Sequence, residues 1–179
     1  MTTFVKKLSK AVGIIYKLSS LNVPKSVLTQ VYYSIAYPYL NYNVCSYLGT
    51  YRTHVDRILL IQKKLVRIIN RAPYLAHTNE LFYNSNILKI QDIYNLNIGL
   101  YKYENRNSGS YERTHSYPTR NRNNLIPNRA RLTISENSVS TVGPNIWNSI
   151  PFEIQNSVSR NAFKRKYKQY LLSSYANGQ

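Results

Sequence analysis

The sequence predicts an all-α fold, and three observations support this. Apolar residues recur every three or four positions over five segments, at the spacing of one helix face. These segments are 3–20, 24–47, 54–71, 90–104 and 159–175. Breaks such as "LNVP" and "GTYRT" separate several of them. A chain of 179 residues with 43% hydrophobic residues is also long and apolar enough to bury a core.

The domain organisation follows from where the periodicity is strong and where it fades. We expect a helical bundle over 1–104, followed by an Asn/Ser/Arg-rich loop segment over 105–158. A basic C-terminal helix is expected within 159–179. No internal repeat is evident.

Prolines interrupt the helical pattern of the first two segments. In the first segment, the apolar residues at helical spacing are Phe4, Leu8, Val12 and Ile15. Pro24 suits the first turn of the second helix, because a helix does not use the amide of its first residue. Pro38 lies inside this second segment, so we expect the helix either to kink there or to end near Tyr37.

The segment over 54–71 has an apolar side and a basic side. Thr53 is expected to cap its N-terminus. The residues of the apolar side are Val55, Ile58, Leu59, Gln62, Leu65 and Ile69. The basic residues fall within an arc of about 120° on another side of the helix. They are Arg57, Lys63, Lys64, Arg67 and Arg71.

The middle of the chain is expected to hold two more helices and a long connection. Thr78 is expected to cap a short helix over 79–85. The apolar stripe of the next helix, over 90–104, consists of Ile93, Leu96, Leu100 and Tyr103. From residue 105 the composition turns to Asn, Ser and Arg without apolar periodicity. This change favours a long loop or a flexible linker over 105–131.

The last third of the chain combines weak β signals with one clear helix. The alternation in "LTISENSVSTVG" is compatible with a small β-hairpin over 132–142 that turns at Glu136-Asn137. Trp147, within "GPNIWNSIP", is expected to anchor a turn onto the helices. Ser159 is expected to cap the last helix. Its apolar side consists of Phe163, Tyr167, Tyr170 and Leu171, and Lys164, Arg165 and Lys168 point away from it.

The charge balance indicates a polyanionic partner. There are 24 Lys and Arg residues against 7 Asp and Glu, a net charge of +17. Nucleic acid is the favoured partner, because phosphates bind Lys and Arg regardless of base sequence. An anionic membrane surface is less favoured, and no span approaches the roughly 18 apolar residues of a membrane-crossing helix. The competing interpretation is a basic surface that faces only water.

The sequence lacks the residue sets that most catalytic and metal sites require. A single cysteine, Cys45, excludes an internal disulfide, and the three histidines are scattered, which argues against a zinc site. The few carboxylates are isolated in sequence, and no phosphate-binding glycine loop is present. We therefore expect no catalytic residue, no metal site and no cofactor. The N-terminus does not resemble a signal peptide, which favours an intracellular protein of the nucleus or cytoplasm.

Tyrosine is abundant, with 18 residues, and several lie among basic residues. Tyrosine at helical spacing is usually part of a core. Aromatic rings in a basic loop can instead stack on the bases of a single strand. At most a few loop tyrosines, such as Tyr111 and Tyr117, are expected to have that role.

Several segments together resemble one family. They include "PKSVLTQVYYSIAYPYLNYNVCSY", "YRTHVDRILLIQKKLVRIINRAPYLAHTNELF", "NILKIQDIYNLNIGLYKYENRN", "GPNIWNSIPFEIQNS" and "FKRKYKQYLL". In this order they resemble the part after the palm in the reverse transcriptases, or RNA-directed DNA polymerases, of non-LTR retrotransposons (LINE-like, jockey-type transposable elements). The similarity covers roughly residues 4–172, and no single motif in it is diagnostic alone.

Two departures from the family limit what the resemblance implies. The aromatic-x-Asp-Asp motif of the family's polymerase palm has no counterpart here, so the chain is expected to begin beyond that domain. After "PYLNY" the family usually has a Cys and then a Trp, whereas this sequence has Asn43 and Tyr47, with Cys45 displaced. No catalytic residue is therefore carried over.

The resemblance implies a role for the basic side of 54–71. It suggests that residues 4–73 are the thumb, a helical bundle that holds the primer–template duplex by its backbone. The implied partners are RNA or an RNA/DNA duplex and the missing palm domain. The second half either binds the element's RNA or packs on the thumb. The chain alone would then not be an enzyme. The alternative is a relic of a decayed element with no selected binding activity.

Overall fold

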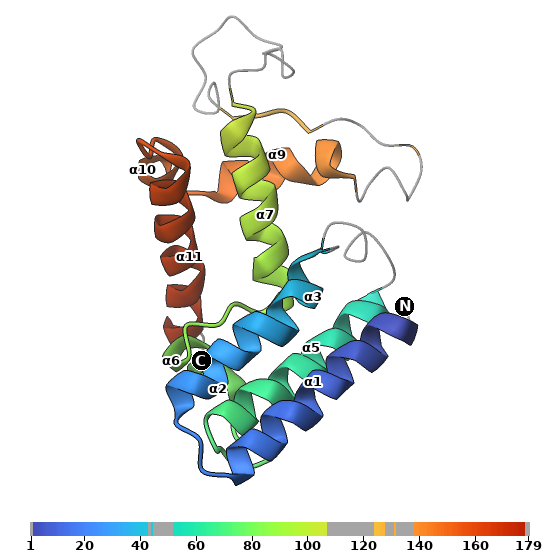
Figure 1. Ribbon diagram of the computed structural model, residues 1–179. Helices are drawn as coiled ribbons and strands as arrows, with labels where there is room; N and C mark the ends of the chain where they lie inside the picture. The colour runs from blue at the N-terminus through green and yellow to red at the C-terminus, as the bar shows by residue number, and fades with distance from the viewer. Residues whose placement is uncertain are drawn as a thin grey trace, which may run out of the picture. The chain divides into compact units, whose positions relative to one another are not determined.

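The computed structural model describes residues 2–42, 44, 52–106, 124–127, 131 and 138–177. All regular secondary structure in these residues is helical, which confirms the all-α prediction (Figure 1). The elements are α1 (Thr2–Ser20), α2 (Lys25–Val31), the π-helical turn η1 (Tyr32–Ala36), α3 (Tyr37–Tyr42), α5 (Arg52–Ile69), α6 (Thr78–Asn84), α7 (Ile90–Glu104), α9 (Val139–Ser149), α10 (Phe152–Gln155) and α11 (Arg160–Asn177). The expected loop residues Tyr111 and Tyr117 lie outside the described residues.

The chain divides into two compact units. The first comprises Met1–Ile93 together with Tyr170–Gln179, and the second comprises Tyr94–Gln169. Each unit has its own buried side chains, so each is described by itself.

In the first unit, α1 and α5 lie side by side (Figure 1). The Ser19 hydroxyl near the end of α1 donates to the Ile68 carbonyl near the end of α5, at 3.4 Å. The two helices therefore run in the same direction, and α2, η1 and α3 bring the chain back between them. The buried side chains that join these helices include Leu8, Ile15, Leu28, Tyr32, Leu40, Ile58, Leu65 and Ile69.

A buried glutamine fixes α5 against the start of α7. Gln62 is fully buried, and its Nε2 donates to the Leu88 carbonyl at 2.7 Å and to the Tyr32 hydroxyl at 3.1 Å. Its Oε1 accepts from the Ile90 amide at 2.9 Å. These bonds satisfy the amide, so a polar residue can occupy the apolar side of α5.

Pro38 does not end its helix. The chain continues from α2 through η1 into α3, and the Tyr37 amide donates to the Tyr32 carbonyl, five residues earlier. A π-helical turn widens the helix where an α-helix would need the amide that proline lacks and would clash with its ring. The expected termination near Tyr37 was therefore wrong.

The predicted caps were right at one helix and wrong at two. The Ser159 Oγ accepts from the Ala162 amide at 3.2 Å, which confirms it as the cap of α11. Thr53 lies inside α5, which begins one residue earlier at Arg52. Thr78 is the first residue of α6, and His77 precedes it at the cap position without a capping side-chain bond. Local spacing identified these helix starts only to within one or two residues.

The second unit contains a helix where the sequence suggested a hairpin and a turn. Val139–Ser149 forms α9, so the second strand of the expected hairpin was wrong, while its turn at Glu136-Asn137 lies outside the described residues. Gly143-Pro144 suggested a turn, but the pair lies inside this helix and is buried. Glycine fits there because α9 approaches α7 closely, since a Cβ at Gly143 would lie 2.5 Å from Lys102 Cε.

Stacked aromatic rings form the core of the second unit. Phe163 is fully buried between Tyr103, at a ring-centroid distance of 4.7 Å, and Trp147, at 5.9 Å. The Tyr103 hydroxyl donates to the Ser157 carbonyl at 2.6 Å. Trp147 thus anchors a helix rather than a turn. Tyr170, expected on the apolar side of the last helix, is instead 44% exposed.

Candidate nucleic-acid interface

The structure separates the two sides of α5 largely as the periodicity predicts. Ile58, Leu65 and Ile69 are buried, and Val66 joins them although the sequence analysis did not include it. On the basic side, the exposed residues of the helix are Arg57 and Lys64, and the partly buried ones are Lys63 and Arg67. The basic side of the helix therefore faces away from the core.

Arg71 does not belong to this side, because α5 ends two residues earlier than predicted, at Ile69. Arg71 adopts a left-handed conformation with φ 50°. Its amide donates to the Ile68 carbonyl at 3.1 Å, and the next amide, of Ala72, donates to the Arg67 carbonyl at 2.9 Å. These two bonds make the Schellman motif that terminates many helices, normally with glycine at the position of Arg71.

This helix end turns the Arg71 side chain toward the end of α1. Its Nη2 donates to the Val23 carbonyl at 3.0 Å. Asn22, next to Val23, is itself left-handed with φ 57° and ends α1 by the same pair of bonds, from Asn22 to Ser19 and from Val23 to Leu18. The ends of two parallel helices thus meet across Arg71.

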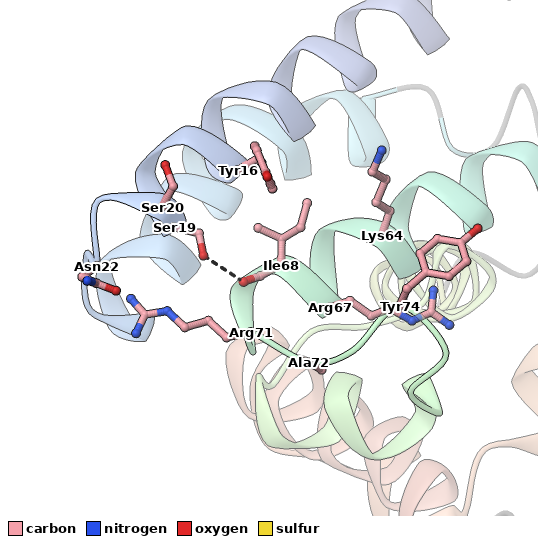
Figure 2. A pocket seen from close by; sticks show the side chains of 10 residues that line it. All are labelled: Tyr16, Ser19, Ser20, Asn22, Lys64, Arg67, Ile68, Arg71, Ala72 and Tyr74. Carbon is pink, nitrogen blue, oxygen red and sulfur yellow. Dashed lines mark hydrogen bonds between the residues drawn. The ribbon is translucent and has the colours of Figure 1, made fainter.

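A groove of about 500 Å³ lies at this meeting point (Figure 2). The residues that line it come from the end of α1, the end of α5 and the segment that follows α5. They are Tyr16, Ser19, Ser20, Asn22, Lys64, Arg67, Ile68, Arg71, Ala72 and Tyr74. Three of the five predicted binding residues are therefore brought together, and they are Lys64, Arg67 and Arg71.

Arg67 and Tyr74 lie next to each other at the edge of the groove (Figure 2). The Arg67 Nε donates to the Ala76 carbonyl at 3.1 Å, which fixes the guanidinium. Its central carbon lies 5.9 Å from the centroid of the Tyr74 ring, within the range of a cation–π contact. The Tyr74 side chain nevertheless remains open to solvent, since the residue is 81% exposed.

The electrostatics of the groove are dominated by positive charge. None of the described residues that line it is acidic. Two helix C-termini, which carry partial negative charge, point toward it. A cation near a helix C-terminus stabilises the helix by about 0.3–1 kcal/mol. Lys64, Arg67 and Arg71 therefore stabilise the two helix ends and present positive charge to an anion in the groove.

The other two predicted residues lie outside the groove. Arg57 is exposed two turns before Lys64 on the same helix. Lys63 contributes positive charge near Lys89 instead. The pKa of Lys89 is lowered chiefly by burial, raised by the Asp92 carboxylate and lowered again by the Lys63 ammonium.

Sequence reasoning missed the two tyrosines of the groove. Tyr16 lies outside the apolar stripe of α1 and is 63% exposed. Tyr74 follows Pro73, immediately after the end of α5. The available signal was an aromatic residue off the apolar pattern and close in sequence to a basic residue, Lys17 for Tyr16 and Arg71 for Tyr74.

Other site types find no support in the part of the chain that the structure describes. No three His, Cys, Asp or Glu residues gather there in a way that could hold a metal ion. None of the helices described there is long and apolar enough to cross a membrane. No family model matches the chain, and no curated protein or solved structure is similar enough to indicate a relationship.

Proposed function

We propose that this chain binds nucleic acid through phosphate contacts, as a thumb-like segment of a non-LTR retrotransposon reverse transcriptase without catalytic activity of its own. The interface consists of the groove and the adjoining basic side of α5. The proposed ligand is RNA or an RNA/DNA duplex, and the palm of such a polymerase is the proposed protein partner. The nucleic-acid part of the proposal stands on charge and geometry, and the retrotransposon part stands on the sequence resemblance.

One observation carries the nucleic-acid proposal. Lys64, Arg67 and Arg71 converge on a groove that no described acidic side chain lines, in a chain of net charge +17. Three cations held within one groove repel one another, and a polyanion relieves that repulsion. Phosphate contacts carry no base information, so we expect affinity to depend little on sequence.

The test compares two triple variants of the full chain. The first changes Lys64, Arg67 and Arg71 to Gln, and the control changes the exposed lysines Lys6, Lys10 and Lys164 to Gln. Both remove three positive charges, so net charge alone predicts equal effects. Binding to a fluorescein-labelled RNA/DNA duplex is measured by fluorescence anisotropy over a range of salt concentrations.

The groove variant should flatten the slope of log K against log salt by roughly 2–3, because each lost phosphate contact removes about 0.7–0.9. The control should change it by less than roughly 1. Equal losses in the two variants would show that the groove is only part of a general positive surface. Circular dichroism checks that both variants keep their helices.

A further inference from the structure

We infer that the groove binds an unpaired stretch of nucleic acid, with bases stacked on Tyr74 and Tyr16 and phosphates on Lys64 and Arg71. The inference rests on the proposed function, which it narrows from nucleic acid in general to a single strand at this site. Phosphate contacts alone would serve a duplex equally well. The argument for a single strand comes from the tyrosines.

Tyr74 is placed as a stacking platform. The Arg67 guanidinium, which is itself held by the Ala76 carbonyl, lies over the ring with its central carbon 5.9 Å from the ring centroid. The residue is 81% exposed, so ring surface remains accessible to a ligand. An aromatic ring backed by a fixed cation is ordered before binding, which lowers the entropic cost of stacking a base on it.

Tyr16 supplies a second ring across the groove, from α1 (Figure 2). It is 63% exposed, and its position off the apolar stripe of α1 means that the core does not require it. Tyr16 and Tyr74 belong to different elements, so their shared groove is a product of the tertiary fold.

Aromatic rings in a groove favour unpaired bases over a duplex. In a duplex the base faces are stacked on one another, and only base edges and phosphates reach a protein. A single strand can turn its base faces toward aromatic side chains, and proteins that bind single strands combine such rings with a basic groove. The groove has both features, and its volume of about 500 Å³ lies in the size range of small-ligand sites, which suits nucleotide units.

A strand is favoured over a free nucleotide because positive charge extends beyond the groove. Arg57 is exposed on the same helix, farther from the groove than Lys64. A single nucleotide would leave this charge without a partner. Phosphates on either side of the stacked bases can reach it.

The experiment uses the full chain and two RNA probes. One is a fluorescein-labelled oligouridylate of about 12 nucleotides, within the range of known single-strand sites. The other is a labelled RNA hairpin whose fully paired stem is closed by a non-nucleotide linker, so that it offers no unpaired base. The variants are Tyr74→Ala, Tyr16→Ala and Tyr74→Phe, and the matched control is Tyr42→Ala, which removes a 91% exposed tyrosine of α3 that does not line the groove.

We expect Tyr74→Ala and Tyr16→Ala each to weaken oligouridylate binding at least about fivefold, the lower end of the loss when one stacking ring is removed. Binding to the hairpin should change less than about twofold. Tyr42→Ala should leave both affinities nearly unchanged, and Tyr74→Phe, which keeps the ring, should lose less oligouridylate affinity than Tyr74→Ala. Both tyrosines are exposed, so truncation should leave the fold intact.

The outcomes distinguish the inference from the proposed function. If the chain binds both probes with a steep salt dependence but Tyr74→Ala and Tyr16→Ala behave like Tyr42→Ala, the single-strand inference is wrong and the proposed function stands. The same conclusion follows if Tyr74→Ala weakens both probes equally. If the unmodified chain binds neither probe, the proposed function fails, and the inference fails with it.

Discussion

Arg71 offers a way to separate a structural role from a binding role at one residue. It holds the left-handed position at the end of α5, where glycine is normally preferred. A left-handed conformation costs a residue with a Cβ about 1–2 kcal/mol, and Arg71→Gly removes that cost. The substitution also loses the bond to the Val23 carbonyl, worth about 0.5–1.5 kcal/mol, and adds freedom to the unfolded chain, worth about 0.5–1 kcal/mol.

These opposing terms nearly cancel, so the free energy of unfolding of Arg71→Gly should stay within about 1 kcal/mol of the parent. Binding should respond differently, because one phosphate contact is lost. The slope of log K against log salt should flatten by about 0.7–0.9. Urea denaturation measures the first quantity, and fluorescence anisotropy with an RNA/DNA duplex measures the second.

The matched control is Asn22→Gly. Asn22 has the same left-handed conformation at the end of α1 and lines the same groove, but it carries no charge. The Asn22→Gly substitution should therefore leave the salt dependence of binding unchanged. If Arg71→Gly lowers stability by more than about 2 kcal/mol and leaves the salt slope unaltered, Arg71 serves to hold the ends of α1 and α5 together through its bond to Val23, and its assignment to phosphate binding is refuted.

Two further predictions concern stability. Gly13→Ala should stabilise the chain by about 0.5–1 kcal/mol, because a Cβ at Gly13 meets nothing within 4 Å. Gly99→Ala should destabilise it by about 1–3 kcal/mol, because its Cβ would lie 2.7 Å from the buried Tyr167 ring. Urea denaturation compares the two variants, and equal effects would contradict this close packing of Gly99 in α7. Burial, with Tyr37 nearby, raises the pKa of Tyr33 from 10.0 to about 12. Because the folded pKa is the higher one, the stability that the Tyr33 hydroxyl contributes is present below about pH 10 and is lost as the pH rises toward about 12. The stability difference between the parent and Tyr33→Phe should therefore shrink over that range. A difference that grows with pH would contradict the raised pKa of Tyr33.

Periodicity predicted the helices best where one apolar stripe runs uninterrupted. The helix predicted over 90–104 has the bounds of α7, and its four stripe residues are all buried. The helix predicted over 3–20 differs from α1 by one residue. In both segments the predicted stripe repeats every three or four positions. In α7 the structure also buries Ile98 and Lys102, which lie outside that stripe.

The predictions of secondary structure were wrong where tertiary packing overrides the local sequence pattern. Gly143-Pro144 has the composition of a turn, but the close approach of α9 to Lys102 favours glycine inside a helix. Pro38 is accommodated by the π-helical turn before it, a feature with no simple sequence pattern. In each case the deciding contact or turn is a property of the folded chain.

Local sequence patterns also predicted only part of the candidate interface. Composition and the α5 pattern predicted basic residues on one side of a helix, and Lys64 and Arg67 lie there. The groove itself depends on the contact between Ser19 and Ile68, which are 49 residues apart, and on the left-handed turn at Arg71. Neither is encoded by local spacing.

That left-handed turn changes which ligand the surface suits. Had α5 continued to Arg71 as predicted, the basic residues would have formed a convex stripe, which can contact phosphates but offers no aromatic ring to an unpaired base. The observed helix end directs Arg71 toward α1, so the charges border a concavity that also contains Tyr16 and Tyr74. A concave, aromatic and basic surface can surround an unpaired nucleotide. This is the physical reason for proposing a single strand at a site for which the sequence implied RNA or an RNA/DNA duplex.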